Sequence, residues 1–275
     1  MATYKMTLDF FGKDNVHFAH EYEIPEEIYN LIQNLKSGKK AGDKVFSVSS
    51  SDIGNFMKKG VDVCTPKLFR TAYGCKLLID ELQRLEKEEP LKKSDSIEKK
   101  VNQYNQACLV VTKKLNHQKD ISKNFDKQMG KLDESIHKAV ENEKMTIEKA
   151  ETQLQDLKKK IMAAKKALEG EKLEKTLQSY KEKKEKIELR VKKAQQRIEN
   201  LQMKKTFKNE TKTFSIGTAR NAYSSPKIAY SWAKDHDVPI NKIYSKSLVE
   251  KFDWAMNTPA DYWKKFPNVK WARKR

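Results

Sequence analysis

Several features that define common protein classes are scarce or missing in this sequence. Its three cysteines, Cys64, Cys75 and Cys108, are widely spaced and odd in number, which is typical of free thiols in a reducing compartment and shows no metal-ligand spacing. No apolar run approaches the ~20 residues of a membrane span, and the first residues lack the apolar stretch of a signal peptide. We therefore expect no membrane partner.

Arginine is also scarce, since lysine supplies nearly all of the positive charge and the first arginine is Arg70. Lysine contacts phosphate as a point charge, whereas the planar arginine fork binds it at two points. The net charge is +19, with 35% of residues charged, which favours a polyanionic partner: nucleic acid first, an anionic membrane surface second. Composition alone also allows a merely soluble basic protein.

Residues 1–120 form a first segment that begins with a strand pattern. Apolar residues alternate with polar ones from Tyr4 to Phe10, and Gly12 to Asn15 have turn chemistry, so we predict a β-hairpin with Lys13 near its tip. Helices follow. Ser51 or Asp52 is predicted to cap a short helix that ends near Gly60.

The sequence signal for a second helix start is stronger, because Thr65 and Pro66 combine an N-cap residue with proline at the first helical position. A further helix leads to His117. Proline is then absent from Leu91 through Ser225, so no proline breaks a helix over that stretch.

Residues 121–208 form a second segment with a heptad pattern. Apolar residues recur at alternating three- and four-residue spacing, stop at Glu169 and Gly170, and resume. Two such stripes with a glycine turn between them predict an antiparallel coiled-coil hairpin. Each arm of about 40 residues would extend roughly 60 Å. A solvated arm is the preferred interpretation, and passing contact with DNA ranks second.

Residues 209–275 form a small third segment that holds all four tryptophans. Ser225 and Pro226 predict a helix start there. The expected fold class is mainly α: a helical catalytic domain with an N-terminal β-hairpin, the long antiparallel coiled-coil hairpin, and a small helical C-terminal domain.

Four residues are candidates for chemistry, although each also has an ordinary explanation. A tyrosine just before a helix, such as Tyr223, is usually a packing residue. A histidine at a helix end, such as His117, often interacts only with the helix dipole. Arg70 suits a surface salt bridge, and Lys13 a solvated turn. Together they supply what phosphoryl transfer to a tyrosine needs: an oxygen nucleophile, groups that stabilise the phosphoryl oxygens, and an acid for the leaving oxygen.

The order of these motifs resembles eukaryotic type IB DNA topoisomerases over almost the whole chain. The motifs are Leu8–Asp14, Lys67–Thr71, Asn116–Gln118, the helical hairpin, Ile216–Tyr223, and the C-terminal stretches Val238–Tyr244 and Lys251–Ala255. The resemblance implies that Tyr223 is the nucleophile, that Arg70 and His117 stabilise the phosphoryl oxygens, and that Lys13 is the general acid. The neighbouring residues expected to contact DNA are Asp14, Lys67, Thr218 and Arg220.

By this resemblance, Tyr223 attacks a phosphate of double-stranded DNA and forms a 3′-phosphotyrosyl bond. The free strand rotates to relax supercoils, and the released 5′-hydroxyl reverses the reaction. The resemblance implies no cofactor, neither ATP nor metal. A nuclear location is the family expectation, and a viral source is left open.

Two departures from the family pattern change what we expect. The family uses an arginine upstream of the lysine hairpin, and no arginine precedes Lys13 here. We therefore expect a fragment, half of a split enzyme or a degenerate protein, with an N-terminal topoisomerase segment or subunit as the partner that supplies this arginine and the DNA clamp. In addition, Ala222 stands where the family usually carries asparagine, which removes a polar contact beside Tyr223.

Two other functions share part of this pattern. A tyrosine recombinase uses the same chemistry, but it would normally place an arginine three residues after the histidine, where this chain has Asp120. A tyrosine recombinase also lacks a helical hairpin of this length between its histidine and its tyrosine. A non-catalytic DNA-binding coiled-coil protein would explain the charge and the heptads alone.

Overall fold

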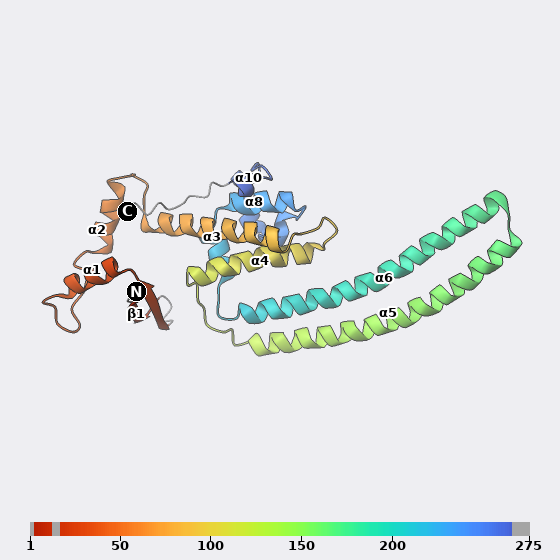
Figure 1. Cartoon of the computed structure of the whole chain (residues 1–275), viewed down its shortest axis with the longest axis horizontal. Coiled ribbons are helices and arrows are strands. Elements are labelled where there is room, and N and C mark those ends of the chain that lie inside the picture. The colour runs from red at the N-terminus through yellow and green to blue at the C-terminus, as the bar shows by residue number, and fades with distance from the viewer. Residues whose placement is uncertain (1–2, 13–16, 266–275) are drawn as a thin grey trace. The chain divides into compact units, whose positions relative to one another are not determined.

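A computed structural model describes residues 3–12 and 17–265 of the chain. It is mainly helical (Figure 1), which confirms the predicted fold class. The chain divides into two compact units. Unit 1 contains Met1–Pro90, Ala107–Asp120 and Thr213–Arg275, and unit 2 contains Leu91–Gln106 and Ile121–Lys212. The predicted three-segment division at residues 120 and 208 stays a prediction.

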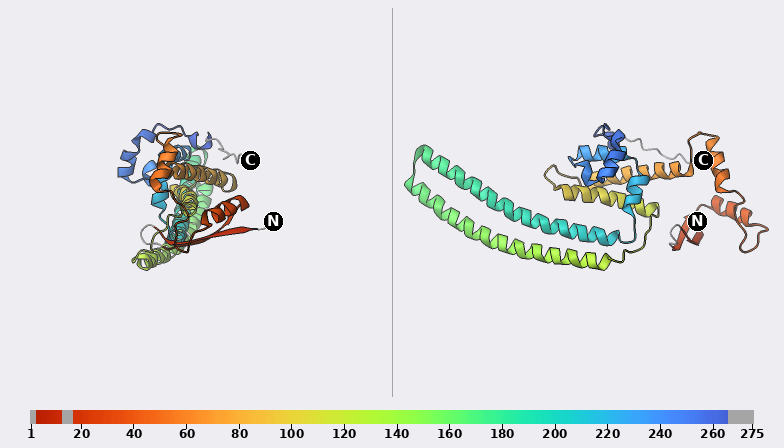
Figure 2. Two further views of the ribbon diagram at one scale, coloured as in Figure 1. Left: turned by 90° about the vertical axis from the view of Figure 1, so that its left-hand side faces the viewer. Right: turned by 180° about the vertical axis from the view of Figure 1, so that it is seen from behind.

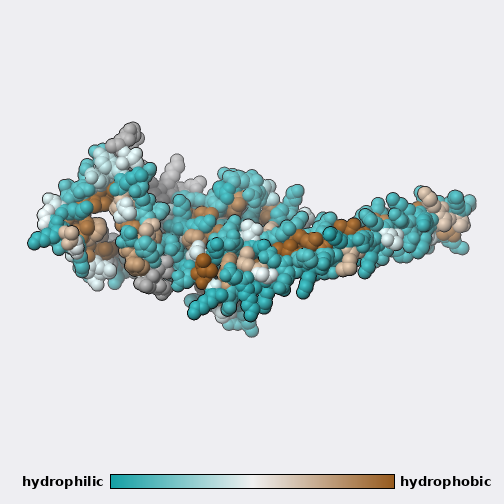
Figure 3. All heavy atoms as spheres, turned by 90° about the horizontal axis from the view of Figure 1, so that it is seen from below, coloured by the Kyte–Doolittle hydropathy of each residue, from teal (hydrophilic) through white to brown (hydrophobic). Residues whose placement is uncertain are grey.

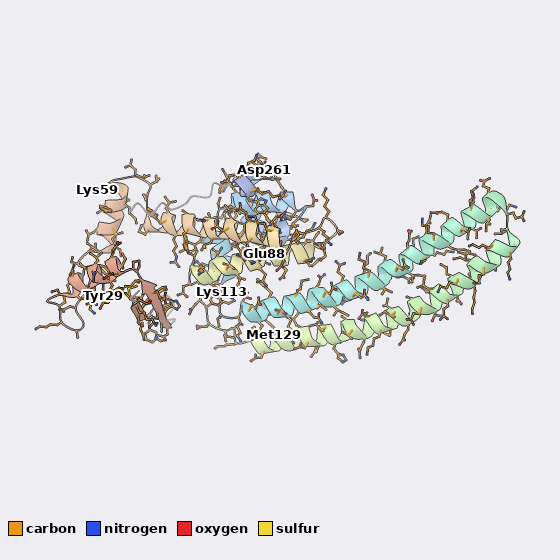
Figure 4. The ribbon with its side chains drawn as sticks, viewed as in Figure 1. Tyr29, Lys59, Glu88, Lys113, Met129 and Asp261 are labelled. Carbon is orange, nitrogen blue, oxygen red and sulfur yellow. The ribbon has the colours of Figure 1, made fainter. Side chains whose placement is uncertain are left out.

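Unit 1 begins with the predicted hairpin. Strand β1 (Tyr4–Phe11) pairs antiparallel with β2 (His17–Ile24), with Tyr4 opposite Ile24 and Phe11 opposite His17. Tyr29 on the next helix, labelled in Figure 4, packs its ring 4.7 Å from that of Tyr4. The predicted tip residues Lys13 and Asp14 lie outside the described residues.

Two short amphipathic helices follow, α1 (Glu26–Lys36) and α2 (Ser50–Lys58). The start predicted for α2 was wrong by two or three residues. Ser49 is the N-cap, and Asp52 is the third helical residue, whose carboxylate accepts a hydrogen bond from the Ser49 backbone N–H. This reciprocal capping box satisfies two backbone donors at once.

Helix α3 (Pro66–Glu88) begins where the sequence predicts, because the Thr65 hydroxyl accepts a hydrogen bond from the Leu68 N–H and proline occupies the first position. Helix α4 (Ile97–Lys114) follows, and its second half belongs to unit 1. Leu78 and Leu82 of α3, and Val111 of α4, are almost completely buried. These side chains form part of the core of unit 1.

The C-terminal segment completes that core. Helix α8 (Pro226–Asp235) buries every residue from Ile228 to Ala233, and α10 (Tyr262–Lys265) packs against both α8 and α3. His236 stacks on Trp232 with ring centroids 4.5 Å apart, and its Nε2 lies 3.3 Å from the Glu86 carboxylate of α3. These contacts fix the C-terminal segment on the helix that carries Arg70.

Unit 2 contains the predicted antiparallel helical hairpin. Helices α5 (Phe125–Ala167) and α6 (Gly170–Glu210) run side by side (Figure 1; Figure 2, right). Their buried side chains include Leu157 of α5 and Ile187 of α6. Gly170 has a φ of +59° at the turn, a left-handed conformation that favours glycine over residues with a side chain.

The three cysteines are free, as their spacing predicts, and all three are buried. Among the helices of the described part of the chain, none is long and apolar enough to cross a membrane.

Replacing Leu78 with alanine tests the core of unit 1. Leu78 is 0% exposed, so Leu78→Ala should lower the free energy of unfolding by about 2–5 kcal/mol. Urea unfolding followed by tryptophan fluorescence measures it, since all four tryptophans lie in the C-terminal segment. The control Leu31→Ala, at a position 55% exposed, should change stability by no more than about 0.5 kcal/mol; equal effects of the two would contradict this core.

Candidate active site

One face of helix α3 carries the first part of the candidate site. Lys67, Arg70 and Gly74 are spaced by three and four residues, so they project from the same side of the helix. The Arg70 guanidinium donates a hydrogen bond through Nη2 to the backbone carbonyl of Leu115, at the end of α4. This bond joins the arginine to the segment that carries His117.

His117 lies three residues after the end of α4. Asn116 adopts a φ of +53°, a left-handed conformation that asparagine tolerates, and the chain then turns into an extended stretch. The His117 carbonyl accepts a hydrogen bond from the Ser215 N–H at 2.9 Å, and the Lys119 N–H donates to the Thr213 carbonyl at 2.9 Å. This short antiparallel pairing holds residues 117–119 against the segment that leads to Tyr223.

A short helix that the sequence did not predict, α7 (Ile216–Ala222), presents Tyr223 at its C-cap. The Tyr223 ring lies 4.6 Å from the His117 ring, measured between centroids. The Arg70 guanidinium carbon lies 5.1 Å from the same ring, and the Lys67 Nζ lies 5.8 Å from it. The structure therefore brings together Tyr223, His117 and Arg70, which are far apart in the sequence.

Gly74 allows α3 to approach the tyrosine segment. A Cβ atom added at Gly74 would lie 2.2 Å from the Tyr223 carbonyl oxygen, much closer than real Cβ atoms come to a backbone oxygen. A glycine inside a helix costs roughly 0.5–1 kcal/mol relative to alanine, so its presence can mark a close approach of another chain segment. Sequence reasoning missed this residue.

Cys75, the next residue along α3, contacts the other side of the tyrosine segment. Its Sγ accepts a hydrogen bond from the Ser225 backbone N–H at 3.2 Å. Burial raises the pKa of the Cys75 thiol, which keeps it in the neutral form. Gly74 and Cys75 thus position the backbone on both sides of Ser224, immediately after the candidate nucleophile.

His117 is neutral in this environment. Burial and the nearby charge of Arg70 lower its pKa from 6.5 to about 4. Its Nε2 is buried and has no hydrogen-bond partner in the described structure. An unpaired buried polar atom costs free energy, and a ligand oxygen that accepts a hydrogen bond from Nε2–H would remove that cost.

The other predicted site residues lie in different settings. Thr218 shares a 2.8 Å hydrogen bond with the Ser215 hydroxyl, and the Arg220 guanidinium lies 5.9 Å from the Tyr244 ring. Lys67 and Ala222 are exposed beside Tyr223. Among the described residues, no group of three or more His, Cys, Asp or Glu side chains could hold a metal ion.

The fold and this cluster define a class of protein: a helical protein with a long helical hairpin and a tyrosine enclosed by an arginine, a lysine and a neutral histidine. A tyrosine ring close to two cations suits chemistry on a phosphate group. Comparison with known proteins agrees with that class. The model of the family "Eukaryotic DNA topoisomerase I, catalytic core" matches residues 1–154, and that of the "C-terminal topoisomerase domain" matches residues 195–265.

The chain therefore belongs to the eukaryotic DNA topoisomerase I family, which confirms the predicted resemblance. It is 32% identical over 265 residues to DNA topoisomerase 1 of Daucus carota, covering 92% of this chain and 33% of the relative. It is 31% identical over 262 residues to DNA topoisomerase 1 alpha of Arabidopsis thaliana, covering 94% and 26%. The chain thus spans about a quarter to a third of the length of these relatives.

A Gly74→Ala variant tests the close approach to Tyr223. The added methyl group must displace either α3 or the tyrosine segment, so we expect a loss of about 1–3 kcal/mol in the free energy of unfolding. Tryptophan fluorescence in urea measures it. The matched control is Gly130→Ala in α5, where an added Cβ meets nothing within 4 Å; circular dichroism should show it neutral or stabilised by up to about 1 kcal/mol. A Gly74→Ala protein as stable as wild type would refute the contact.

The low pKa of His117 predicts a pH-dependent stability. The native pKa of about 4 lies below the unfolded value of 6.5, so the unfolded chain takes up the proton first as pH falls. Stability should therefore fall between pH 6.5 and pH 4, and a His117→Gln variant should lose less over this range. Urea unfolding at pH 7 and pH 5 compares the two. The control His137→Gln, exposed on α5, should keep the wild-type pH dependence; an unchanged dependence in His117→Gln would show the assignment to be wrong.

Proposed function

We propose that this chain is the tyrosine-bearing part of a type IB DNA topoisomerase, which relaxes supercoiled double-stranded DNA without ATP or metal. The observation that carries the proposal is the placement of the Tyr223 ring close to both His117 and Arg70, which come from three separate segments. Family membership supports the choice of topoisomerase over recombinase or a non-catalytic coiled-coil protein.

In the proposed reaction, the Tyr223 phenol oxygen bonds to a DNA phosphorus while the bond from phosphorus to the 5′ oxygen breaks. The product is a 3′-phosphotyrosyl bond and a free 5′-hydroxyl. Lys13 gives a proton to the departing oxygen, and the phenolic proton passes to water. The phosphotyrosyl bond keeps the free energy of the phosphodiester, so attack by the 5′-hydroxyl reseals the strand after it has rotated.

Arg70 and His117 have the proposed role of stabilising the negative charge on the phosphoryl oxygens. Arg70 lies beside the ring and carries a permanent charge. His117 is neutral at physiological pH because its pKa is about 4, so it acts as a hydrogen-bond donor through Nε2–H and not as a cation. Lys67, Thr218, Arg220 and Asp14 have the proposed role of contacting the DNA around the cleaved phosphate.

We further propose that the reaction needs residues beyond these 275. No arginine precedes Arg70 in this sequence, whereas the family pattern has one upstream of the lysine hairpin. A second polypeptide segment would supply that arginine and the clamp around DNA. The proposed compartment is the nucleus, on the family resemblance; a rat relative is named "DNA topoisomerase I, mitochondrial".

Trapping on a nicked suicide substrate tests the nucleophile. The chain is mixed with the part of the Daucus carota relative outside the 265 aligned residues, and then with DNA whose cleavage releases a short, unligatable strand. A covalent protein–DNA adduct is expected on a denaturing gel. Tyr223→Phe should abolish it, because only the phenol oxygen can bond to phosphorus, and Arg70→Ala should reduce it by at least about 100-fold.

Tyr180→Phe, on α6, is the matched control and should form adduct at the wild-type level. Adduct formation by Tyr223→Phe would contradict the proposal that Tyr223 is the nucleophile. Robust relaxation of supercoiled plasmid by the 275-residue chain alone would overturn the proposal that a second segment is needed.

A further inference from the structure

Unit 2 contains a groove that the candidate site does not use. It lies between the first half of α4, which belongs to this unit, and the second half of α6, and its volume is about 500 Å³. One wall is formed by residues of Lys193–Phe207 and the other by residues of Ser96–Asn105. The α6 wall is about 20 Å long, since a helix rises 1.5 Å per residue. The Gln106 side chain donates a hydrogen bond to the Glu210 carboxylate at 3.1 Å, which joins the two helices next to one end of the groove.

The surface that lines this groove is mainly apolar. Val101 of α4 and three side chains of α6, Leu201, Met203 and Phe207, contribute to it, and each of the four is only half-buried. Elsewhere, hydrophilic residues cover most of the surface of the helical hairpin, shown in teal in Figure 3. An apolar groove on such a surface is typical of a binding site, because a partner that removes these side chains from water gains free energy.

Three cations border the groove. Lys193, Arg197 and Lys204 are spaced by four and seven residues, so they project from the same side of α6. All three are exposed, and none of them forms an ion pair within the described part of the chain. Glu98 is the one carboxylate among the described residues that line the groove. The groove therefore combines an apolar floor with a positively charged border.

This combination favours a protein partner over nucleic acid. Duplex DNA is bound through its phosphates, so it needs the cations but gains little from an apolar floor. A helix that binds in a groove uses both features, because its apolar side chains at i, i+3, i+4 and i+7 fill the floor while charged residues beside them meet the border. We propose that this groove binds an acidic amphipathic helix of a partner protein. The α6 wall matches about 14 residues of such a helix.

Binding of two synthetic peptides to the 275-residue chain tests the proposal. The first, of about sixteen residues, has leucines on one helical face, glutamates beside that face and alanines opposite. The second has the same composition in an order that spreads the leucines around the helix. Fluorescence anisotropy measures both affinities, at concentrations below those at which the peptides self-associate. We expect the first peptide to bind at least about tenfold more tightly; equal affinities would overturn the proposal.

Two pairs of variants on α6 locate the binding site. Arg197→Glu reverses a border charge and should weaken binding of the first peptide by about tenfold or more. Lys181→Glu makes the same change at an exposed position outside the groove, and its affinity should stay within about twofold of wild type, because solvent and salt screen distant charges. Leu201→Asn places a polar side chain in the floor and should also weaken binding by about tenfold. Its control Leu189→Asn, at a position 49% exposed, should bind as wild type does.

Hydrogen exchange gives a readout that needs no variant. Backbone amides of residues 97–106 and 193–207 should become better protected when the first peptide binds, whereas amides next to Gly170, at the turn of the hairpin, should not change. Because Arg197 and Lys181 are both exposed, their variants should keep the wild-type circular dichroism spectrum, so a loss of affinity in Arg197→Glu is not a loss of folding.

Three further results would contradict the proposal. The first is an equal loss of affinity in Arg197→Glu and Lys181→Glu, which would assign binding to the general positive charge of the chain. The second is a Leu201→Asn variant that binds the first peptide as tightly as wild type does. The third is a loss of affinity for duplex DNA in Leu201→Asn, which would assign the groove to nucleic acid. None of these measurements involves Tyr223, so this inference and the proposed function stand or fail separately.

Discussion

The candidate site depends on one backbone contact, the approach of the Tyr223 carbonyl to Gly74 of α3. Only the absence of a side chain at Gly74 lets the two segments come this close. Cys75 then accepts a hydrogen bond from Ser225, so the chain is held on α3 by both a contact and a polar bond. With the backbone placed in this way, the Tyr223 ring extends toward Arg70, which lies one turn earlier on the same helix.

The same helix also controls the state of the histidine. Arg70 donates to the Leu115 carbonyl, two residues before His117, and burial together with the charge of Arg70 lowers the pKa of His117, which keeps the imidazole neutral. The arginine therefore acts on both of its neighbours in the cluster: it lies close to the phenol ring and disfavours a positive charge on the His117 imidazole. Two cations and one neutral donor are a different electrostatic environment from three cations, and the difference comes from burial together with the charge of Arg70.

Local patterns in the sequence were sufficient to predict the regular elements. Alternation predicted β1, the Thr65–Pro66 pair predicted the start of α3, and the heptads with Gly170 predicted the paired helices α5 and α6. The start of α2 was misplaced because several neighbouring serines can all cap a helix, and only the reciprocal bonds of Ser49 and Asp52 decide between them. Helix α7 is too short to show a period.

The members of the site were predicted from the order of motifs, but their contacts were not. Gly74 and Cys75 meet the tyrosine segment across about 150 residues of chain, and no local pattern encodes such a pairing. A glycine inside an otherwise regular helix is the one signal that reasoning from sequence could have used. Lys13 and Asp14 lie outside the described residues, so their place in the site stays a prediction.

Unit 1 is built from stretches that are far apart in the sequence, which affects the order in which the chain folds. Its core combines three stretches, of which the third follows α5 and α6 and contributes the buried Trp263. Contacts between distant residues form slowly, whereas neighbouring helices joined by a tight turn pair early. During synthesis the helical hairpin is complete while unit 1 still waits for its C-terminal stretch. The nascent chain thus exposes Arg70 and His117 before Tyr223 leaves the ribosome, and the candidate site can form only after both helices of the hairpin have been made.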